Sequence, residues 1–226
     1  QAINVQGADH HSTVTRVRAG LQALEMGVPP DYPEYVLHQM VTVMKGGEEI
    51  KISKRAGSYV TVRDLIDDVG VDAVRYFFLM RKRDSQLVFD VDLAREQSEK
   101  NPVFYVQMAH ARLSGIFRTA DRDPESIGGE LDLARLPAPQ DLELLKKLAE
   151  FPEITLAAAR EREPHRVTTY LHELAAVVHG WYHHTRAVGA PEGDATEHAR
   201  LLLARAGRLV LANGLRLLGI SAPDRM

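Results

Sequence analysis

The chain has 226 residues, of which 45% are hydrophobic and 26% are charged, and its formal net charge is −3 at pH 7. This size suits one large domain or two small ones, and no apolar run approaches the roughly 18 residues that span a bilayer, so no membrane role is expected. The chain contains no cysteine, which excludes disulfides and thiolate metal sites and fits a reducing cytoplasm. The negative charge argues against non-specific nucleic-acid binding but leaves room for a local basic face.

The first residues, Gln1–His11, contain no initiator Met and no apolar secretory segment. Ile3–Val5 are expected to form the end of a buried strand, yet nothing before them supplies a partner strand. We therefore expect a truncated chain or a processed fragment. The first part of such a chain should expose apolar surface and be the less stable half.

Short β-like segments alternate with helices up to about residue 100. Ser12 or Thr13 is expected to cap a helix that ends at Gly27. The β-branched and apolar run Tyr35–Met44, followed by a turn at Gly46-Gly47, predicts a hairpin. The other elements expected here are the second hairpin strand over 49–52, helices over 61–70 and 72–81, and an edge strand over 87–89.

The composition changes near Asn101, and the remaining pattern is almost wholly helical. Asn101 as a cap and Pro102 in the first turn predict a helix that runs to about Thr119. A loop rich in Asp, Pro and Gly follows through Gln140, and a helical bundle should fill the rest of the chain. Further helices are expected over 141–149, 153–162, 164–188 and 195–218, the last with an apolar stripe of Leu201, Ala204, Leu209, Ala212, Leu215 and Leu218.

The segment Lys51–Gly57, K-I-S-K-R-A-G, carries the most chemical information. Lys51 and Lys54 flank Ser53 in a loop just after the expected hairpin, so two ammonium groups can approach one polyphosphate. Attack on an α-phosphate develops charge on the leaving pyrophosphate, and such cations stabilise that charge. On these residues alone a solvated basic loop is an equally good interpretation, because K-x-S-K occurs often by chance.

This segment resembles the K-M-S-K-R-A-G signature of bacterial arginyl-tRNA synthetases, which are class I aminoacyl-tRNA synthetases, with Ile52 in place of the usual Met. The resemblance implies a mostly α chain from the C-terminal portion of such an enzyme. A helical anticodon-binding bundle (101–226) would be attached to the C-terminal remnant of a Rossmann-like α/β catalytic domain with its connecting region (1–100). The other matching segments are Val60–Leu65, Val71–Leu79, Phe89–Ala94, Asn101–Gln107, Ala109–Arg112 and Leu218–Met226.

The resemblance implies ATP-dependent attachment of arginine to tRNA-Arg through arginyl-adenylate, with Mg²⁺ accompanying the ATP. Lys51 and Lys54 would stabilise the phosphates, and Ser53 would support their loop. The family's second signature, H-I-G-H, has no counterpart here, since no H-x-G-H occurs in the sequence. Catalysis needs both signatures around one ATP, so this chain alone is expected to be inactive.

The stretch Gly7–His11, G-A-D-H-H, resembles the end of the family's nucleotide-binding Rossmann strand. Gly7, Asp9 and His10 would line the ATP site, where an acidic group can accept hydrogen bonds from ribose hydroxyls. Without the resemblance, a polar strand-to-helix loop would be the preferred interpretation.

The family's helical bundle holds the tRNA anticodon, whose unstacked bases need aromatic or guanidinium planes. Met108 and Arg112 share one helix face, although the family often has Tyr in place of Met108. For Trp181, the only tryptophan, core packing is preferred over base stacking, and for Arg112 and Arg186 RNA contact is preferred over a solvated surface. The candidate tRNA contacts are Met108, Arg112, Trp181, Tyr182, Arg186 and Met226.

His179 and His183 have the i, i+4 spacing of metal ligands, but no convincing third ligand accompanies them, so no protein-bound metal is expected. The expected partners are tRNA-Arg, ATP and arginine, and a monomer is expected. A glutamyl enzyme also carries K-x-S-K-R but fits the segments Asp72–Leu79 and Leu218–Met226 poorly. The main alternative is a stand-alone tRNA-binding or regulatory module derived from the synthetase, and a helical scaffold without an RNA role is a third.

Overall fold

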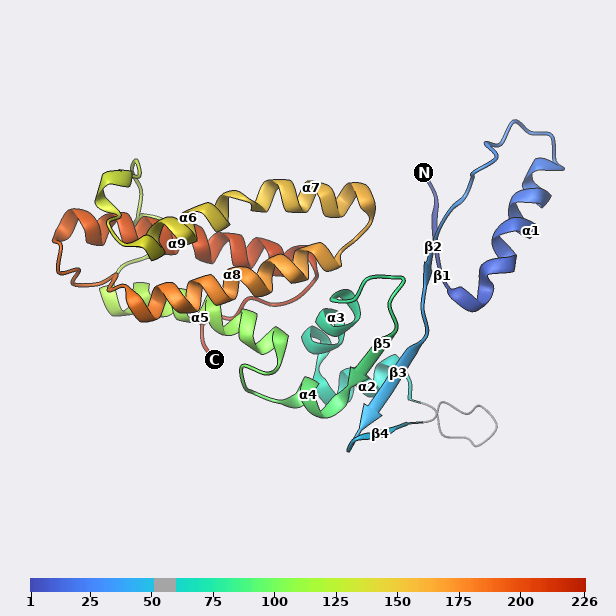
Figure 1. Ribbon diagram of the computed structural model, residues 1–226, viewed down its shortest axis with the longest axis horizontal. Helices are drawn as coiled ribbons and strands as arrows, with labels where there is room; N and C mark the ends of the chain where they lie inside the picture. The colour runs from blue at the N-terminus through green and yellow to red at the C-terminus, as the bar shows by residue number, and fades with distance from the viewer. Residues whose placement is uncertain (51–59) are drawn as a thin grey trace. The chain divides into compact units, whose positions relative to one another are not determined.

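The computed structural model describes residues 1–50 and 60–226 (Figure 1). The chain divides into two compact units, one of residues 1–60 with 81–92 and one of residues 61–80 with 93–226. The second unit therefore includes a segment that precedes the boundary expected near residue 101. Each unit is described by itself below.

The first unit begins with a strand–helix–strand arrangement. Strand β1 (Ile3–Gly7) pairs in parallel with β2 (Glu34–His38), and helix α1 (His11–Gln22) connects them. The expected cap at Ser12 or Thr13 was wrong, because a 3-10 turn over Ala8–His10 leads straight into α1 before those residues. Parallel strands joined through a helix are the unit from which Rossmann-like folds are built.

A second, small sheet belongs to the same unit. Its central strand β3 (Val41–Lys45) pairs antiparallel with β4 (Glu48–Glu49) and parallel with β5 (Leu87–Asp90). Gly46 and Gly47 join the hairpin with φ of +63° and +78°, as its tight turn requires. The hairpin and the edge strand are confirmed, but the run 35–44 is not one strand, because its two ends pair with different strands.

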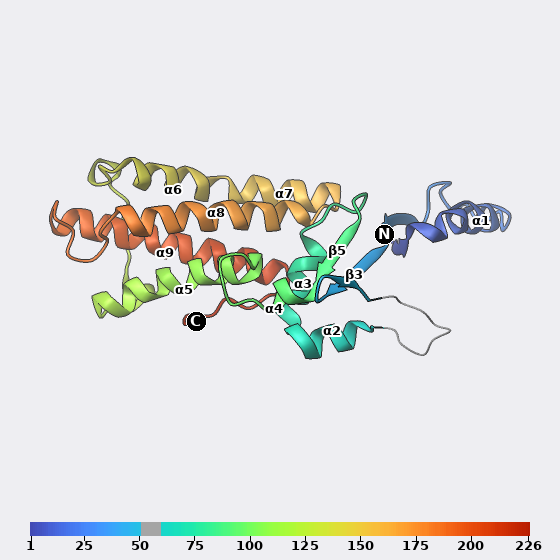
Figure 2. The same cartoon turned by 60° about the horizontal axis from the view of Figure 1, so that its bottom comes forward.

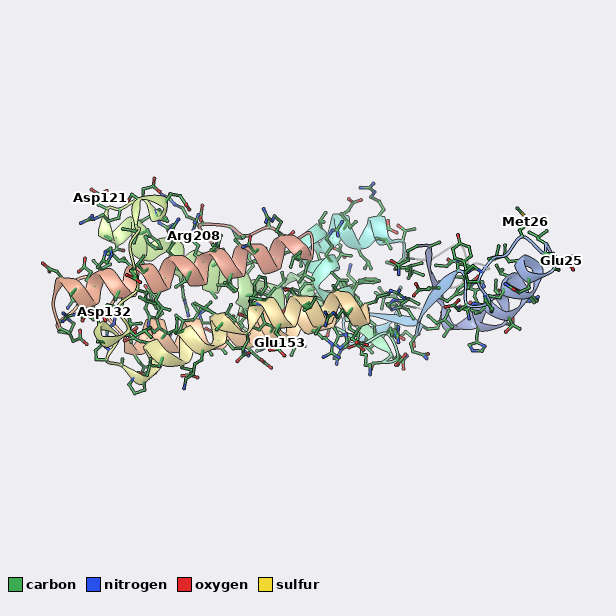
Figure 3. The ribbon with its side chains drawn as sticks, turned by 90° about the horizontal axis from the view of Figure 1, so that it is seen from above. Glu25, Met26, Asp121, Asp132, Glu153 and Arg208 are labelled. Atoms are coloured by element: carbon green, nitrogen blue, oxygen red, sulfur yellow. The ribbon has the colours of Figure 1, made fainter. Side chains whose placement is uncertain are left out.

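Several large apolar side chains of the first unit are exposed. Ile3 and Val5, expected in a buried strand, are 44% and 64% exposed. Among the described residues, two buried polar atoms have no hydrogen-bond partner, Gln6 Oε1 and the Tyr35 hydroxyl. The other exposed apolar side chains within residues 1–50 are Val17, Leu24, Met26, Tyr32 and Met40, and Figure 3 labels Met26 and its neighbour Glu25.

The second unit is helical, and local capping explains where its first helices begin. The Thr61 side chain accepts a hydrogen bond from the Asp64 backbone amide, and the Asp64 carboxylate accepts one from the Thr61 backbone amide. The Asn101 side chain caps the helix after it through the Val103 amide (3.2 Å). The helices are α2 (Val62–Val69), α3 (Val71–Leu79), α4 (Val91–Arg95, at the border of the units), α5 (Pro102–Ala120), α6 (Pro139–Ala149), α7 (Phe151–Glu161), α8 (His165–His184) and α9 (Asp194–Leu217).

Helices α5 to α9 form a bundle in which α8 contacts α5, α6, α7 and α9 (Figures 1 and 2). Its centre is aliphatic, and a buried hydroxyl joins α3 to it, since Tyr76 donates to the Thr168 carbonyl (3.1 Å). Residues 61–80 therefore pack with the bundle. Leucines with at most 1% exposure make up much of its core: Leu113, Leu144, Leu171, Leu174, Leu203, Leu211 and Leu215.

The expected apolar stripe of α9 is confirmed at Leu201, Ala204, Leu215 and Leu218, which are buried, but not at Leu209. Leu209 is 57% exposed and points away from the core. Gly207 and Gly214 are buried instead. A Cβ on Gly207 would lie 2.9 Å from Leu113 Cδ1, and one on Gly214 would lie 2.6 Å from Leu171 Cδ2. These two glycines let α9 lie close to α5 and α8.

Candidate functional site

The C-terminal tail, residues 219–226, is held along one face of α5. The four side chains that hold it are spaced three or four residues apart, so they share that face. The bonds run from Gln107 Nε2 to the Ser221 carbonyl (3.0 Å), from His110 Nδ1 to the Pro223 carbonyl (2.9 Å), from Ser114 Oγ to Asp224 Oδ1 (2.8 Å) and from Arg118 Nη1 to the Asp224 carbonyl (2.8 Å).

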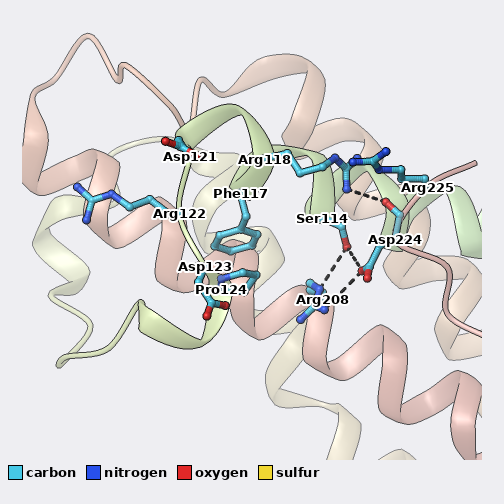
Figure 4. A pocket seen from close by; sticks show the side chains of 10 residues that line it. All are labelled: Ser114, Phe117, Arg118, Asp121, Arg122, Asp123, Pro124, Arg208, Asp224 and Arg225. Atoms are coloured by element: carbon cyan, nitrogen blue, oxygen red, sulfur yellow. Dashed lines mark hydrogen bonds and ion pairs between the residues drawn. The ribbon is translucent and has the colours of Figure 1, made fainter.

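A cavity of 530 Å³ opens where this tail meets the end of α5 (Figure 4). Asp224 lies in it and is bound by Ser114 and by Arg208 (Nη2 to Oδ1, 3.4 Å). The hydrogen bond from Ser114 and the charge of Arg208 hold the pKa of Asp224 below its ordinary value. The charged side chains around the cavity are Arg118, Arg122, Arg208, Arg225, Asp121, Asp123 and Asp224.

The arginines of this cavity are not all neutralised. Arg118 and Arg208 are engaged with Asp224, whereas Arg122 and Arg225 form no ion pair with another described residue. Two guanidinium groups thus remain available to an anion. The sequence analysis did not identify these four arginines as candidate contacts. The polar residues spaced three or four apart along α5 were a signal that the face that binds the C-terminal tail is not part of the apolar core.

A second cavity, of 270 Å³, lies between the end of α5 and the end of α8. Tyr182 and Arg186 line it, and Tyr182 is 44% exposed. The Arg112 guanidinium carbon lies 5.9 Å from the centre of the Tyr182 ring, within the range of a cation–π contact. The structure therefore brings three of the sequence-predicted contacts, Arg112, Tyr182 and Arg186, to one place.

The other sequence-predicted contacts in the helical part lie elsewhere or are covered. Met108 is half-buried on α5, one turn before Arg112. Met226 is 51% exposed and lines a separate cavity beside Gln107 and Phe104. Trp181 is only 1% exposed, so its ring has no free face for a base in this structure. Core packing, the preferred interpretation of Trp181, is the one that this burial supports.

Trp181 is instead part of a buried polar network. Its indole nitrogen donates to Asp141 Oδ1 (2.7 Å). Arg200 contacts the same carboxylate and also donates to the Arg186 carbonyl (3.0 Å) and to Glu192 (3.1 Å). The network therefore fixes the backbone on both sides of Tyr182, because Trp181 precedes it and Arg186 lies in the loop after α8.

In the first unit, Gly7, Asp9 and His10 lie at the carboxyl end of β1, where ligands of open parallel sheets bind. Asp9 Oδ1 occupies the place that a Cβ on Gly7 would take, so a larger residue at position 7 would displace the carboxylate. Asp9 and His10 are exposed and lie 3.5 Å apart. Lys51, Ser53 and Lys54, the predicted phosphate-binding residues, lie outside the described residues.

Neither a metal cluster nor a membrane span is found in the part of the chain that the structure describes. No three His, Cys, Asp or Glu side chains there are grouped as metal ligands would be. His179 is engaged with Arg112 and the Tyr105 carbonyl, while His183 is exposed. Within residues 1–50 and 60–226, no helix is both long and apolar enough to cross a bilayer.

Known proteins that are similar to this chain are arginine–tRNA ligases. The arginine–tRNA ligases of Geobacter metallireducens and Bordetella petrii are 60% and 55% identical over the whole chain, which spans 40% of the length of each. A Campylobacter jejuni structure described as an arginyl-tRNA synthetase superposes with a TM-score of 0.87 at 31% identity, over 99% of this chain and 47% of that one. The Thermus thermophilus arginyl-tRNA synthetase gives 0.73 at 25% identity, over 99% and 41%. The DALR anticodon binding domain model matches residues 106–226, more than half of the sequence, and the chain belongs to that family.

Proposed function

We propose that this chain is the part of an arginine–tRNA ligase that binds the anticodon of tRNA-Arg and carries one of the enzyme's ATP-phosphate loops. The whole enzyme would attach arginine to tRNA-Arg through arginyl-adenylate, using ATP with Mg²⁺, as a cytoplasmic monomer. The match of the anticodon binding domain over residues 106–226 supports the RNA part of this proposal. The identity with arginine–tRNA ligases along the whole chain supports the choice of amino acid.

The observation that carries the proposal is that Tyr182 and Arg186 line the 270 Å³ cavity between α5 and α8 while the Arg112 guanidinium lies beside the Tyr182 ring. Single-stranded loops are recognised by stacking unpaired bases on aromatic rings and guanidinium planes. Tyr182 offers an exposed ring, and the two arginines offer planar donors that can meet base edges or phosphates. An anticodon loop presents such bases.

The cavity around Asp224 adds a second contact area to the same helix end. Phe117 and Arg118 line it, whereas Ile116 and Thr119 line the cavity beside Tyr182. Neighbouring residues of α5 thus lie at two cavities on different faces of one helix. Phosphates of a bound RNA loop would be attracted to this cavity, where Arg122 and Arg225 form no ion pair with any residue that the structure describes.

For the first unit we propose a nucleotide-binding role. Lys51 and Lys54, with Ser53, would contact the phosphates of ATP, and Gly7, Asp9 and His10 would line the nucleotide site. The carboxyl end of β1 supports the latter assignment, because it leaves Asp9 and His10 exposed. We further propose that residues 1–100 act with the catalytic machinery and residues 101–226 with the anticodon.

The test is the affinity of the full 226-residue chain for tRNA-Arg and for an anticodon-mutated tRNA-Arg at one salt concentration. We expect the chain to prefer the unmutated tRNA and the Y182A variant to lose most of that preference, since stacking on one aromatic ring contributes about 1–3 kcal/mol. Y32A, which removes a tyrosine of the first unit, is the matched control. Equal affinity for the two tRNAs would contradict anticodon recognition.

A further inference from the structure

His179 is a buried histidine between α5 and α8 whose two ring nitrogens both have partners. The residue is 6% exposed. Its Nδ1 lies 2.7 Å from Arg112 Nη1, and its Nε2 lies 3.2 Å from the Tyr105 carbonyl oxygen. The Tyr105 ring stands edge-on to the imidazole with 4.5 Å between ring centres. The imidazole therefore has little freedom to turn.

These partners select one form of the histidine. A carbonyl oxygen only accepts, so Nε2 carries the proton and donates it to Tyr105. A guanidinium only donates, so Nδ1 must keep its lone pair to accept from Arg112. The bonded form is the neutral imidazole with its proton on Nε2, and it is an acceptor aimed at Arg112.

Arg112 has few other constraints. Its remaining ion-pair partner, Glu99, is 3.9 Å away and its side chain is 72% exposed, so that contact is weak. The Tyr182 ring attracts the guanidinium from 5.9 Å but does not set its orientation. The short bond to a buried acceptor is the contact that fixes the direction of the guanidinium.

We propose that His179 is a positioning residue for RNA recognition, which holds the Arg112 guanidinium beside Tyr182 so that its free N–H groups face the bound anticodon loop. This inference rests on the proposed function. His179 itself is covered and touches no RNA; it acts through Arg112. Without it, Arg112 would have to lose side-chain freedom on binding, at a cost in affinity.

Two substitutions separate the two nitrogens. H179N places an amide oxygen near the position of Nδ1 and keeps an acceptor for Arg112. H179Q places its amide near the position of Nε2, keeps a donor for the Tyr105 carbonyl and leaves no acceptor for Arg112. We expect H179N to bind tRNA-Arg within about threefold of the unsubstituted chain and H179Q to bind about tenfold more weakly.

A double-mutant cycle shows whether His179 acts through Arg112. R112A should weaken tRNA binding at least as much as H179Q, and H179Q added to R112A should weaken it no further. H183Q, at an exposed histidine one turn along α8, should bind as the unsubstituted chain does. If H179Q still lowers affinity in the R112A background, its effect is structural and the proposal is overturned.

The pH dependence of binding supplies a readout that does not depend on whether H179Q folds. Burial lowers the pKa of His179, and the charged or titratable groups that act on it are Arg112, Glu99 and His183. When Nδ1 takes a proton below the ordinary histidine range, it stops accepting from Arg112 and repels it. The affinity of the unsubstituted chain for tRNA-Arg should then fall about tenfold as the pH is lowered. The affinity of R112A should not fall in this way. Protonation of exposed histidines would instead strengthen RNA binding. The direction of the change in affinity on acidification therefore distinguishes the titration of His179 from that of the exposed histidines.

The outcomes also separate this inference from the proposed function. If R112A binds as the unsubstituted chain does, the positioning role of His179 is overturned, whereas anticodon discrimination by the unsubstituted chain still decides the proposed function. If R112A binds weakly and H179Q binds normally, only the role of His179 is overturned. H179N and H179Q that bind equally well would overturn it too.

Discussion

Asp141 and Arg200 form a buried ion pair near the N-terminal ends of α6 and α9. Arg200 Nη2 lies 3.3 Å from Asp141 Oδ2, and the two side chains are 2% and 0% exposed. They belong to α9 and α6, and Asp141 also accepts from Trp181 of α8. One carboxylate therefore ties three helices together, because Arg200 and Trp181 both donate to it.

Replacing Asp141 should destabilise the bundle strongly. In D141N one acceptor oxygen becomes an amide NH2 that cannot accept from Arg200, and the arginine charge is left without its buried partner. Breaking a buried pair from one side costs about 3–5 kcal/mol, and urea denaturation would measure the change in the free energy of unfolding. K100A is the control, because Lys100 is 80% exposed and lies 3.9 Å from Glu96, and such a pair contributes about 0–1 kcal/mol. A loss below about 1 kcal/mol in D141N would contradict the role given to Asp141.

The salt dependence of tRNA binding should report on the cavity around Asp224. Arg122 and Arg225 line it without an ion pair to another described residue, so we expect them to contact RNA phosphates. The double variant R122A/R225A should bind tRNA-Arg more weakly and should show a slope of log affinity against log salt that is shallower by about 1–2. R160A, which removes an exposed arginine of α7, should keep the slope. An unchanged slope in R122A/R225A would place the phosphates elsewhere.

Those parts of the fold that depend on neighbouring residues could be predicted from the sequence. The start of α5 follows from Asn101 and Pro102, and that of α2 from Thr61 and Asp64, because caps act within one turn. The hairpin follows from Gly46-Gly47. All three are found where the local chemistry predicts them.

The misses concern partners that are distant in the sequence. Trp181 packs into the core because Asp141, forty residues earlier in the chain, offers it an acceptor. Leu209 is exposed because α9 turns its glycines, not that leucine, towards α5 and α8. The arginines around Asp224 meet only because the tail folds back on α5. Helical periodicity alone does not predict these contacts, because their partners are far apart in the sequence.

Replacing Gly214 and Gly180 by alanine should change the stability of the bundle in opposite directions. At Gly214, a Cβ would lie 2.6 Å from Leu171 Cδ2 and within 3.3 Å of two more atoms of that side chain. The Leu171 side chain would have to move, and overpacking of this kind lowers stability by about 1–3 kcal/mol. At Gly180 of α8, a Cβ meets nothing within 4 Å, so G180A should gain up to about 1 kcal/mol of helix propensity. Thermal unfolding of both variants tests this, and a G214A variant as stable as G180A would show that the close packing of α9 is not needed.

The stability of the bundle should decrease as the solution becomes mildly acidic. Burial lowers the pKa of both His110 and His179 below the ordinary value of 6.5. The unfolded chain then binds more protons than the folded chain once the pH falls below 6.5, so stability is lost from there down to the folded pKa values and is fully present above. The lowered pKa of Asp224 does not contribute in this range, because its loss begins only near the ordinary value of 3.8.

Urea denaturation at about pH 7.5 and about pH 5.5 would measure this loss. The double variant H110N/H179N is the informative comparison, because an asparagine amide can donate to the Pro223 carbonyl in place of His110 Nδ1 and can accept from Arg112 in place of His179 Nδ1. That variant keeps these two hydrogen bonds, loses the bond from His179 Nε2 to the Tyr105 carbonyl and cannot titrate at either position. Its stability should therefore change much less between the two pH values. H183N should retain the full pH dependence, since His183 is exposed. If H110N/H179N loses as much stability on acidification as the unsubstituted chain, the destabilising protons bind elsewhere, and the neutral form assigned to His179 is not what stabilises the contact between α5 and α8.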